Sequence, residues 1–257
     1  MKTTLLVLLI LFSTLLNAQD GRAIVRLYEK EMESTDQEAM LTMKLISKNG
    51  STRERTLIIS NRTDKSNRDA SYIYFSAPAD IKGTAFLSVE NEAGNDDQWL
   101  FLPTLKRSRR ISSNEKGKSF LGTDFTYEDL GSEKSSGITY KYLRSEQLGN
   151  IILQVVEAVY TNPTRSKETG YSKRILFINS ENNMLVKTEF YGIEGTLKKI
   201  LDCSNFEYYA DSKKWRPKTL IMKNMEKETQ TILQFEYYKI NKGIDPNRFT
   251  LRNLESN

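Results

Sequence analysis

The first periodic segment of the chain has the apolar spacing of a helix. Asp20 stands where a residue that caps a helix N-terminus is expected, and charged side chains lie opposite a single apolar stripe. The sequence therefore predicts one amphipathic helix over residues 20–32. Its apolar stripe consists of Ile24, Leu27, Tyr28 and Met32.

After this helix the pattern changes to the two-residue alternation of β-strands. Leu41, Met43 and Leu45 alternate with polar residues, and Asn49-Gly50 then supplies the strongest hairpin signal in the chain. Around eleven short strands, joined by turns such as 94–96 and 181–183, predict a mainly β fold built on one long antiparallel sheet. A sheet of that length curls, so the helix can pack inside it. The further strand segments are 53–59, 70–75, 84–91, 98–102, 139–144, 151–160, 173–179, 184–191, 198–209, 216–224 and 229–240.

The N-terminus has the pattern of an export signal. Lys2 precedes an apolar run at 5–16, and Leu16-Asn17-Ala18 ends in the small residue that a signal peptidase needs. The run is shorter than the roughly 20 residues of a membrane-spanning helix. Because the only cysteine is Cys203, no cysteine stands directly after the cleavage site, where a lipid would be attached. We predict a cleaved signal peptide over residues 1–18, periplasmic localisation, and a single domain over 19–257.

Composition limits the chemistry of the mature chain. The sequence has no histidine and one cysteine, which excludes Ser-His and Cys-His nucleophile pairs and a thiolate metal cluster. Loss of Lys2 with the signal peptide lowers Lys+Arg from 38 to 37 against 33 Asp+Glu, a mild excess without a concentrated basic footprint for nucleic acid. Carboxylate pairs, a Lys-activated Ser and hard-metal oxygen sites remain open, and the dense acidic runs are 95–97 and 128–129. These runs fit a solvated turn or a cap better than a catalytic pair. We therefore expect no enzyme activity, no cofactor, no metal and no nucleic-acid partner, with a carboxylate-pair hydrolase as the remote alternative.

The most distinctive stretch lies in the middle of the chain. A strand that ends in Trp99, Phe101 and Pro103 precedes a basic strand at 106–110. The segment that follows carries glycine and serine, yet it also has large apolar side chains. Flexible backbone with such side chains fits a lid that covers something apolar, or a loop folded onto its own core. Those apolar residues are Phe120, Leu121, Phe125, Tyr127 and Leu130.

Three runs in this stretch are ordered and specific: 98–103 (QWLFLP), 109–111 (RRI) and 120–130 (FLGTDFTYEDL). Together they resemble the signature of the LolA-like outer-membrane lipoprotein-sorting proteins, and residues 245–250 (DPNRFT) extend the likeness toward the end of the chain. The resemblance implies an unclosed antiparallel half-barrel with helices, a short helical lid segment among them, on its concave face. It also implies an apolar cavity there for the acyl chains of a lipoprotein or lipid.

Two groups of residues are candidates for binding. Trp99, Phe101, Leu102, Phe120, Leu121, Phe125 and Tyr127 are expected to line the apolar cavity or its lid, with plain core packing as the alternative. Lys106, Arg107, Arg109 and Arg110 are expected to meet lipid phosphate or a partner protein, or else to keep an edge strand from pairing with other chains. No catalytic or metal-binding residue is predicted.

The leading hypothesis is a monomeric periplasmic carrier that binds acyl chains of lipoproteins or lipids and ferries them toward the outer membrane. The resemblance implies an inner-membrane transporter of the RND (MMPL-like) type and an outer-membrane acceptor as partners. The alternative is a non-enzymatic periplasmic accessory subunit that docks such a transporter through its basic strand.

Overall fold

The computed structural model describes residues 20–91, 95–131 and 137–256. The predicted signal peptide, 1–18, and Gly94 of the predicted turn lie outside them. Within these residues the α-helices are α1 (Gly21–Met32), α2 (Pro163–Thr169) and α3 (Leu251–Glu255), and the 3-10 helices include η1 (Pro103–Leu105), η2 (Ser113–Glu115), η3 (Glu128–Leu130) and η5 (Pro246–Phe249). The strands are β1 (Asp36–Ile46), β2 (Thr52–Thr63), β3 (Asp69–Ala77), β4 (Ala85–Val89), β5 (Asp97–Leu102), β6 (Arg107–Arg110), β7 (Ile138–Leu148), β8 (Ile151–Tyr160), β9 (Tyr171–Asn179), β10 (Leu185–Gly192), β11 (Leu197–Tyr209), β12 (Lys214–Asn224) and β13 (Thr229–Ile240).

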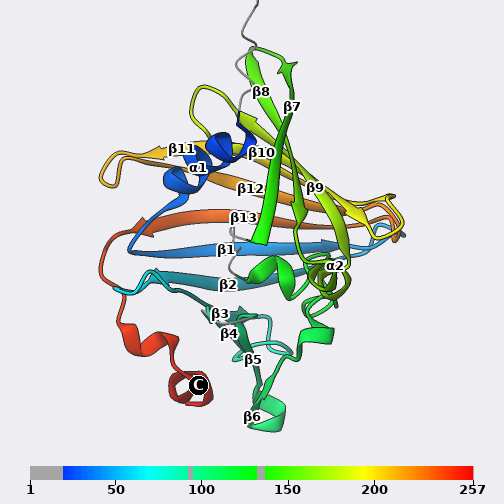
Figure 1. The fold of residues 1–257 in the computed structure, drawn as a ribbon. Coiled ribbons are helices and arrows are strands. Elements are labelled where there is room, and N and C mark those ends of the chain that lie inside the picture. The colour runs from blue at the N-terminus through cyan, green and yellow to red at the C-terminus, as the bar shows by residue number, and fades with distance from the viewer. Residues whose placement is uncertain (1–19, 92–94, 132–136, 257) are drawn as a thin grey trace, which may run out of the picture.

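These strands form one antiparallel sheet that is not closed into a barrel, as predicted. The order is β6-β5-β4-β3-β2-β1-β13-β12-β11-β10-β9-β8-β7, so β6 and β7 are the two free edges. Figure 1 shows the sheet curling until β7 and β8 come in front of β12, β13 and β1. The described residues hold thirteen strands, so the prediction of about eleven was low; the four-residue basic strand β6 pairs with β5 and completes one edge.

The chain builds this sheet in two runs of neighbouring strands. It goes from β1 outward to β6, then crosses to the opposite edge and returns from β7 to β13, which pairs with β1. The Asn49-Gly50 hairpin prediction is confirmed, since Gly50 has φ +82° between the paired β1 and β2. We call the described part of the crossover, residues 111–131, the lid. Because it connects the two free edges, it has to pass over one face of the sheet.

The two faces of the sheet have separate cores. The lid residues Phe120, Phe125 and Tyr127 belong to a cluster on the concave face with residues of β1–β5, β12 and β13. On the other face, near β3–β5, the C-terminal residues Phe249 and Leu254 pack in a second cluster. The C-terminal segment with η5 and α3 therefore covers the convex side of the half-barrel, while the lid and α1 occupy the concave side (Figure 1).

Helix α1 begins as predicted, because the Asp20 side chain accepts a hydrogen bond from the backbone N–H of Arg22. Its buried face differs from the predicted stripe. Ile24 and Val25 are buried against β7–β9, whereas Leu27 is 50% exposed. The first turn decides this orientation, since Gly21 lies so close to the β7 backbone that a Cβ would come within 2.7 Å of it. Among the described residues no helix is long and apolar enough to cross a membrane.

Candidate functional site

A cavity of about 550 Å³ lies on the concave face, between α1 and the lid. Strands β9–β12 form its floor, and Arg165 of α2 lines one end together with Asn95 and Asp96, which precede β5. It is lined by Val25, Tyr28, Glu29, Asn95, Asp96, Phe125, Glu128, Asp129, Gly131, Gly137, Tyr160, Asn162, Arg165, Tyr171, Arg174, Leu176, Leu185, Thr188, Phe190, Leu201 and Met222. This volume is in the range of pockets that bind small molecules, about 300–1,000 Å³.

The floor of the cavity is apolar. Successive side chains along a strand point to opposite faces of the sheet. The antiparallel pairing of β9 to β12 therefore places side chains from four strands next to one another on the concave face. Because β-strands present every second side chain to the same face, these residues are scattered in the sequence and adjacent in space. The floor residues are Leu176 of β9, Leu185 and Phe190 of β10, Leu201 of β11 and Met222 of β12.

An ion pair joins the lid to α2 at one end of the cavity. The Arg165 guanidinium donates to Glu128 Oε1 at 2.5 Å and to Glu168 Oε2 at 3.3 Å. Burial raises the pKa of Glu128, and the charge of Arg165 acts in the opposite direction. Arg165 therefore compensates two carboxylates and ties the lid to the β8–β9 connection.

A second polar group lies at the wall of the cavity beside β11. Tyr171 Oη donates to Asp129 Oδ1 at 3.1 Å and accepts a hydrogen bond from Lys199 Nζ at 2.9 Å. Burial and the neighbouring Asp129 carboxylate raise the pKa of Tyr171 well above its usual value, so the hydroxyl stays protonated and can donate. Lys199 lies 3.4 Å from Asp129 Oδ2, which neutralises the buried carboxylate.

The lid is fixed to the sheet by aromatic packing. Phe120 is 1% exposed, and its ring lies 5.3 Å from Phe86, 5.5 Å from Tyr127 and 6.0 Å from Phe75. The Phe86 and Tyr127 contacts have the edge-on geometry that aromatic rings favour. The tip of the lid therefore lies in the main core instead of resting on its surface.

Buried hydrogen bonds add to this anchoring. The backbone N–H of Asp124 donates to Thr231 Oγ1 at 2.9 Å, while the Asp124 carboxylate accepts from Thr231 at 2.8 Å and from Thr229 at 2.5 Å. Gln98 Nε2 donates to the carbonyl of Tyr127 at 2.9 Å. Because these groups are buried, breaking the contacts would leave polar atoms without water.

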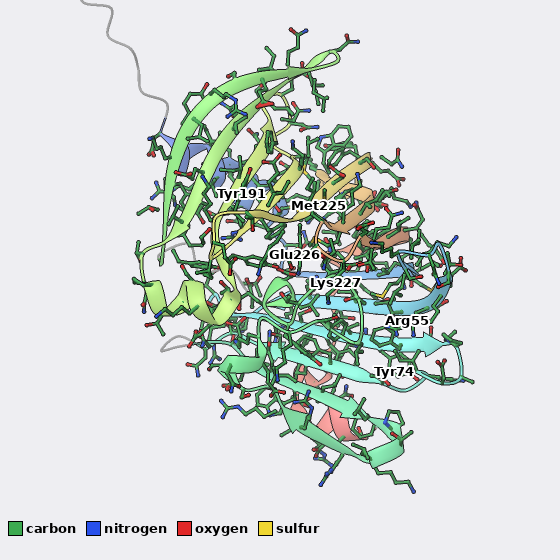
Figure 2. The ribbon with its side chains drawn as sticks, turned by 90° about the vertical axis from the view of Figure 1, so that its right-hand side faces the viewer. Arg55, Tyr74, Tyr191, Met225, Glu226 and Lys227 are labelled. Atoms are coloured by element: carbon green, nitrogen blue, oxygen red, sulfur yellow. The ribbon has the colours of Figure 1, made fainter. Side chains whose placement is uncertain are left out.

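A smaller pocket of about 150 Å³ lies on the other side of the lid. Polar groups line it, among them Lys198 and Lys199 at the start of β11 and Glu226 and Lys227 of the β12–β13 turn, the last two labelled in Figure 2. Tyr171 contributes to both cavities and stands between them. Its size and polarity make this pocket unsuitable for an acyl chain.

The structure separates the predicted apolar residues into three places. Phe125 lines the main cavity. Phe120, Leu121 and Tyr127 pack in the hydrophobic cluster between the lid and the concave face of the sheet. Leu102 also packs against that cluster. Trp99 and Phe101 point to the opposite face of β5, where they pack with the C-terminal cluster. Their side chains are therefore on the other side of the sheet from the cavity floor.

The predicted basic residues lie together at one edge of the sheet. Arg109 pairs with Glu115 of the lid at 3.1 Å, and Arg110 pairs with Asp97 of β5. In the described part of the chain Lys106 and Arg107 make no salt bridge, and both are exposed. These four cations do not reach the main cavity.

Sequence reasoning did not single out the cavity floor. Leu176, Leu185, Phe190, Leu201 and Met222 all lie in segments predicted as strands, but nothing in their spacing distinguishes a cavity floor from ordinary core. The alternation of apolar and polar residues shows which side chains share a face of a strand. It does not show which face of the sheet borders a cavity.

Comparisons with known proteins agree with this architecture. A domain from Vibrio parahaemolyticus described as an outer-membrane lipoprotein-sorting protein is 31% identical over 93% of this chain and 100% of its own, with a TM-score of 0.85. A DUF1329 family protein from Desulfovibrio piger (22% identity, 91% and 99% coverage, TM-score 0.83) shares the fold. So does a LolA superfamily protein from Nitrosomonas europaea (18% identity, 90% and 97% coverage, TM-score 0.70).

The other comparisons add little. The model of a protein family described as "Uncharacterized protein" matches residues 67–256, which include the lid and all the floor strands. No functionally curated protein matches the chain.

Proposed function

From the premise that this chain belongs to the LolA-like family of outer-membrane lipoprotein-sorting proteins, we propose that it is a periplasmic carrier of acyl chains. It binds the chains of a lipid or lipoprotein in the cavity between α1 and the lid and ferries them toward the outer membrane. The observation that carries this proposal is the cavity of about 550 Å³ with its apolar floor.

The energetics of the cavity suit reversible carriage. Each methylene moved out of water contributes about 0.8 kcal/mol, so a chain in this cavity gains strongly from burial. Part of that gain is lost to the immobilisation of the ligand and to desolvation of polar groups at the cavity ends. An apolar floor with polar groups at the cavity ends therefore supports binding that can be reversed at an acceptor.

The charged side chains at the cavity favour binding over catalysis. Glu29 pairs with Arg22, Glu128 with Arg165 and Asp129 with Lys199. Carboxylates held in this way position the walls of the cavity, so we propose that the chain has no catalytic role.

Native mass spectrometry tests the carrier proposal on protein purified gently from the periplasm of its own host. We expect a stoichiometric lipid or acylated peptide that leaves on denaturation and can be identified after solvent extraction. Leu201→Glu, which places a carboxylate on the cavity floor, should lose the ligand, whereas Leu148→Glu at an exposed hairpin position should keep it. A clean ligand-free mass without uptake of added lipids would contradict the proposal.

A transporter-docking accessory subunit is the second candidate. It is favoured by the exposed basic edge, where Lys106 and Arg107 stand without salt bridges in the described structure. Lys106→Glu with Arg107→Glu should then weaken a salt-sensitive complex with an RND-type transporter while lipid content stays unchanged. Lys65→Glu with Lys82→Glu is the matched control, since both lysines are exposed and make no salt bridge in the described structure. Equal binding by both double variants would argue against docking through this edge.

A further inference from the structure

We propose that Thr188 of β10 binds the acyl carbonyl of the cargo, so that the ligand is recognised as an acyl ester or amide. The inference rests on the proposed carrier function and specifies how its ligand is held. Its basis is a buried hydroxyl in the cavity lining that has no hydrogen-bond partner among the described residues.

The Thr188 hydroxyl opens to the cavity. The residue is 3% exposed and lines the cavity, yet its Oγ1 makes no hydrogen bond with any residue that the structure describes. In the same part of the chain, Gln98 Oε1 is the one side-chain polar atom that is fully enclosed and without a partner. Thr188 Oγ1 is therefore not fully enclosed, and at so buried a position the space beside it is the cavity.

The neighbours of this hydroxyl on the floor are apolar. The strand register places Thr188 opposite Leu176 of β9 and Leu201 of β11, and Met222 of β12 lies opposite Leu201. All four residues line the cavity. A hydroxyl in such surroundings is costly to leave unpaired once a bound chain has displaced water from it. A ligand oxygen at this level would supply the missing partner.

Thr188 also marks a boundary along the floor. Two positions further along β10, Phe190 lies opposite Arg174 of β9 and Lys199 of β11, so the next row toward α2 carries two cations. In the other direction Leu185 packs in the cluster that includes Val25 of α1. The floor is therefore apolar beneath α1 and becomes polar beyond Thr188.

An acyl carbonyl has the position and the chemistry that this boundary requires. In an ester or amide the carbonyl joins the hydrocarbon chain to the polar part of the molecule. When the chain lies beneath α1, the carbonyl falls at the row of Thr188, where its oxygen accepts a hydrogen bond from the hydroxyl. An alkyl ether with the same chain lacks this acceptor and would leave the hydroxyl poorly paired.

Substitution of Thr188 separates carbonyl binding from a role in shape. Thr188→Val removes the hydroxyl and keeps a β-branched side chain that strands favour. Loss of one neutral hydrogen bond should weaken binding of an acyl ester about two- to tenfold and leave binding of the matching ether unchanged. Thr188→Ser keeps a hydroxyl and should retain the preference for the ester. Thr52→Val, at an exposed position of β2, is the matched control.

The test uses delipidated mature protein with monopalmitoylglycerol and hexadecylglycerol, an ester and an ether with matched chains, below their critical micelle concentrations. Displacement of a fluorescent fatty acid reports both affinities, and infrared spectroscopy reports the carbonyl band of the bound ester. In Thr188→Val we expect the ester-to-ether affinity ratio to fall about two- to tenfold and the carbonyl band to move to higher frequency. Both should stay near the wild-type values in Thr188→Ser and Thr52→Val.

An affinity ratio that Thr188→Val leaves unchanged would overturn the assignment, and so would an equal loss of ester and ether, which indicates an effect of shape alone. The wild-type protein supplies a test that needs no variant, since a carbonyl band at the frequency of the ester in a hydrocarbon solvent would also overturn it. Failure of both ligands to bind to wild-type protein that circular dichroism shows to be folded would instead reject the carrier function itself.

Discussion

Removal of the Phe120 ring should destabilise the whole half-barrel, because this lid residue is part of the main core. The ring is 1% exposed and contacts Phe75, Phe86 and Tyr127 at centroid distances between 5.3 and 6.0 Å. A lid of this kind differs from a surface flap, whose loss would leave the sheet intact. Phe120→Ala therefore distinguishes an integral wall from an independent cover.

The expected magnitude follows from the burial. Replacing a buried Phe by Ala lowers the free energy of unfolding by about 3–5 kcal/mol, through lost transfer energy and the cavity that remains. That is a large part of the roughly 5–15 kcal/mol that stabilises a typical domain. For a chain of this size each kcal/mol shifts the Tm by about 2–4 °C, so the Tm should fall by about 10 °C.

Urea unfolding followed by circular dichroism measures the effect, with Tyr208→Ala as the control. Tyr208 is 48% exposed, so Tyr208→Ala should lower the free energy of unfolding by less than about 1 kcal/mol. Hydrogen exchange should show faster opening of amides in β3 and β4 as well as in the lid, since Phe75 and Phe86 lie there. A loss below 1 kcal/mol for Phe120→Ala, with the protection of β3 and β4 unchanged, would refute the integral-wall argument.

Three other predictions concern single groups. Asp124→Ala should lower the free energy of unfolding by about 1–3 kcal/mol because Thr231 loses its buried partner, and Asp124→Asn, which keeps one acceptor, should cost less by urea unfolding. Hydrogen bonds from the Ser112 hydroxyl and backbone, followed by Arg109, lower the pKa of Glu115 to about 2. The stability that the Glu115 carboxylate adds is therefore complete above about pH 4.5 and is lost as the pH falls toward 2. Carbon-13 NMR of the Glu115 carboxyl should show a midpoint near 2, and Ser112→Ala should raise that midpoint. Burial raises the pKa of Cys203 to about 12, so iodoacetamide at pH 8 should label the thiol in urea and not in the native protein; equal labelling in both would contradict its burial.

Local patterns predicted the elements well because each element is specified by neighbouring residues. The alternation in β1, the Asn49-Gly50 turn and the Asp20 cap all depend on contacts within a few positions, and each is confirmed. The resemblance added what alternation could not, the unclosed sheet with a lid on its concave face. The orientation of α1 escaped prediction because the close approach of Gly21 to β7 involves residues about 120 positions apart.

The cavity could not be derived in the same way. Trp99 and Phe101 were correctly assigned to a common face of their strand, and the period of two guarantees that. Which face is hollow depends on the crossover passing over one side of the sheet and the C-terminal segment over the other. Leu100, between the two aromatic residues, is the one that joins the core beneath the lid.

The distribution of roles within the lid bears on what the family resemblance means. In the run 120–130, Phe120, Asp124 and Tyr127 attach the lid to the sheet, whereas Phe125 faces the cavity. Most of the run therefore serves to hold the lid against the sheet. Most of the surface that would contact an acyl chain belongs instead to β9–β12. Those floor residues lie outside the signature, so substitutions there can change the cargo while the lid signature stays the same. The selectivity of the proposed carrier would therefore depend on floor residues that the lid signature does not include.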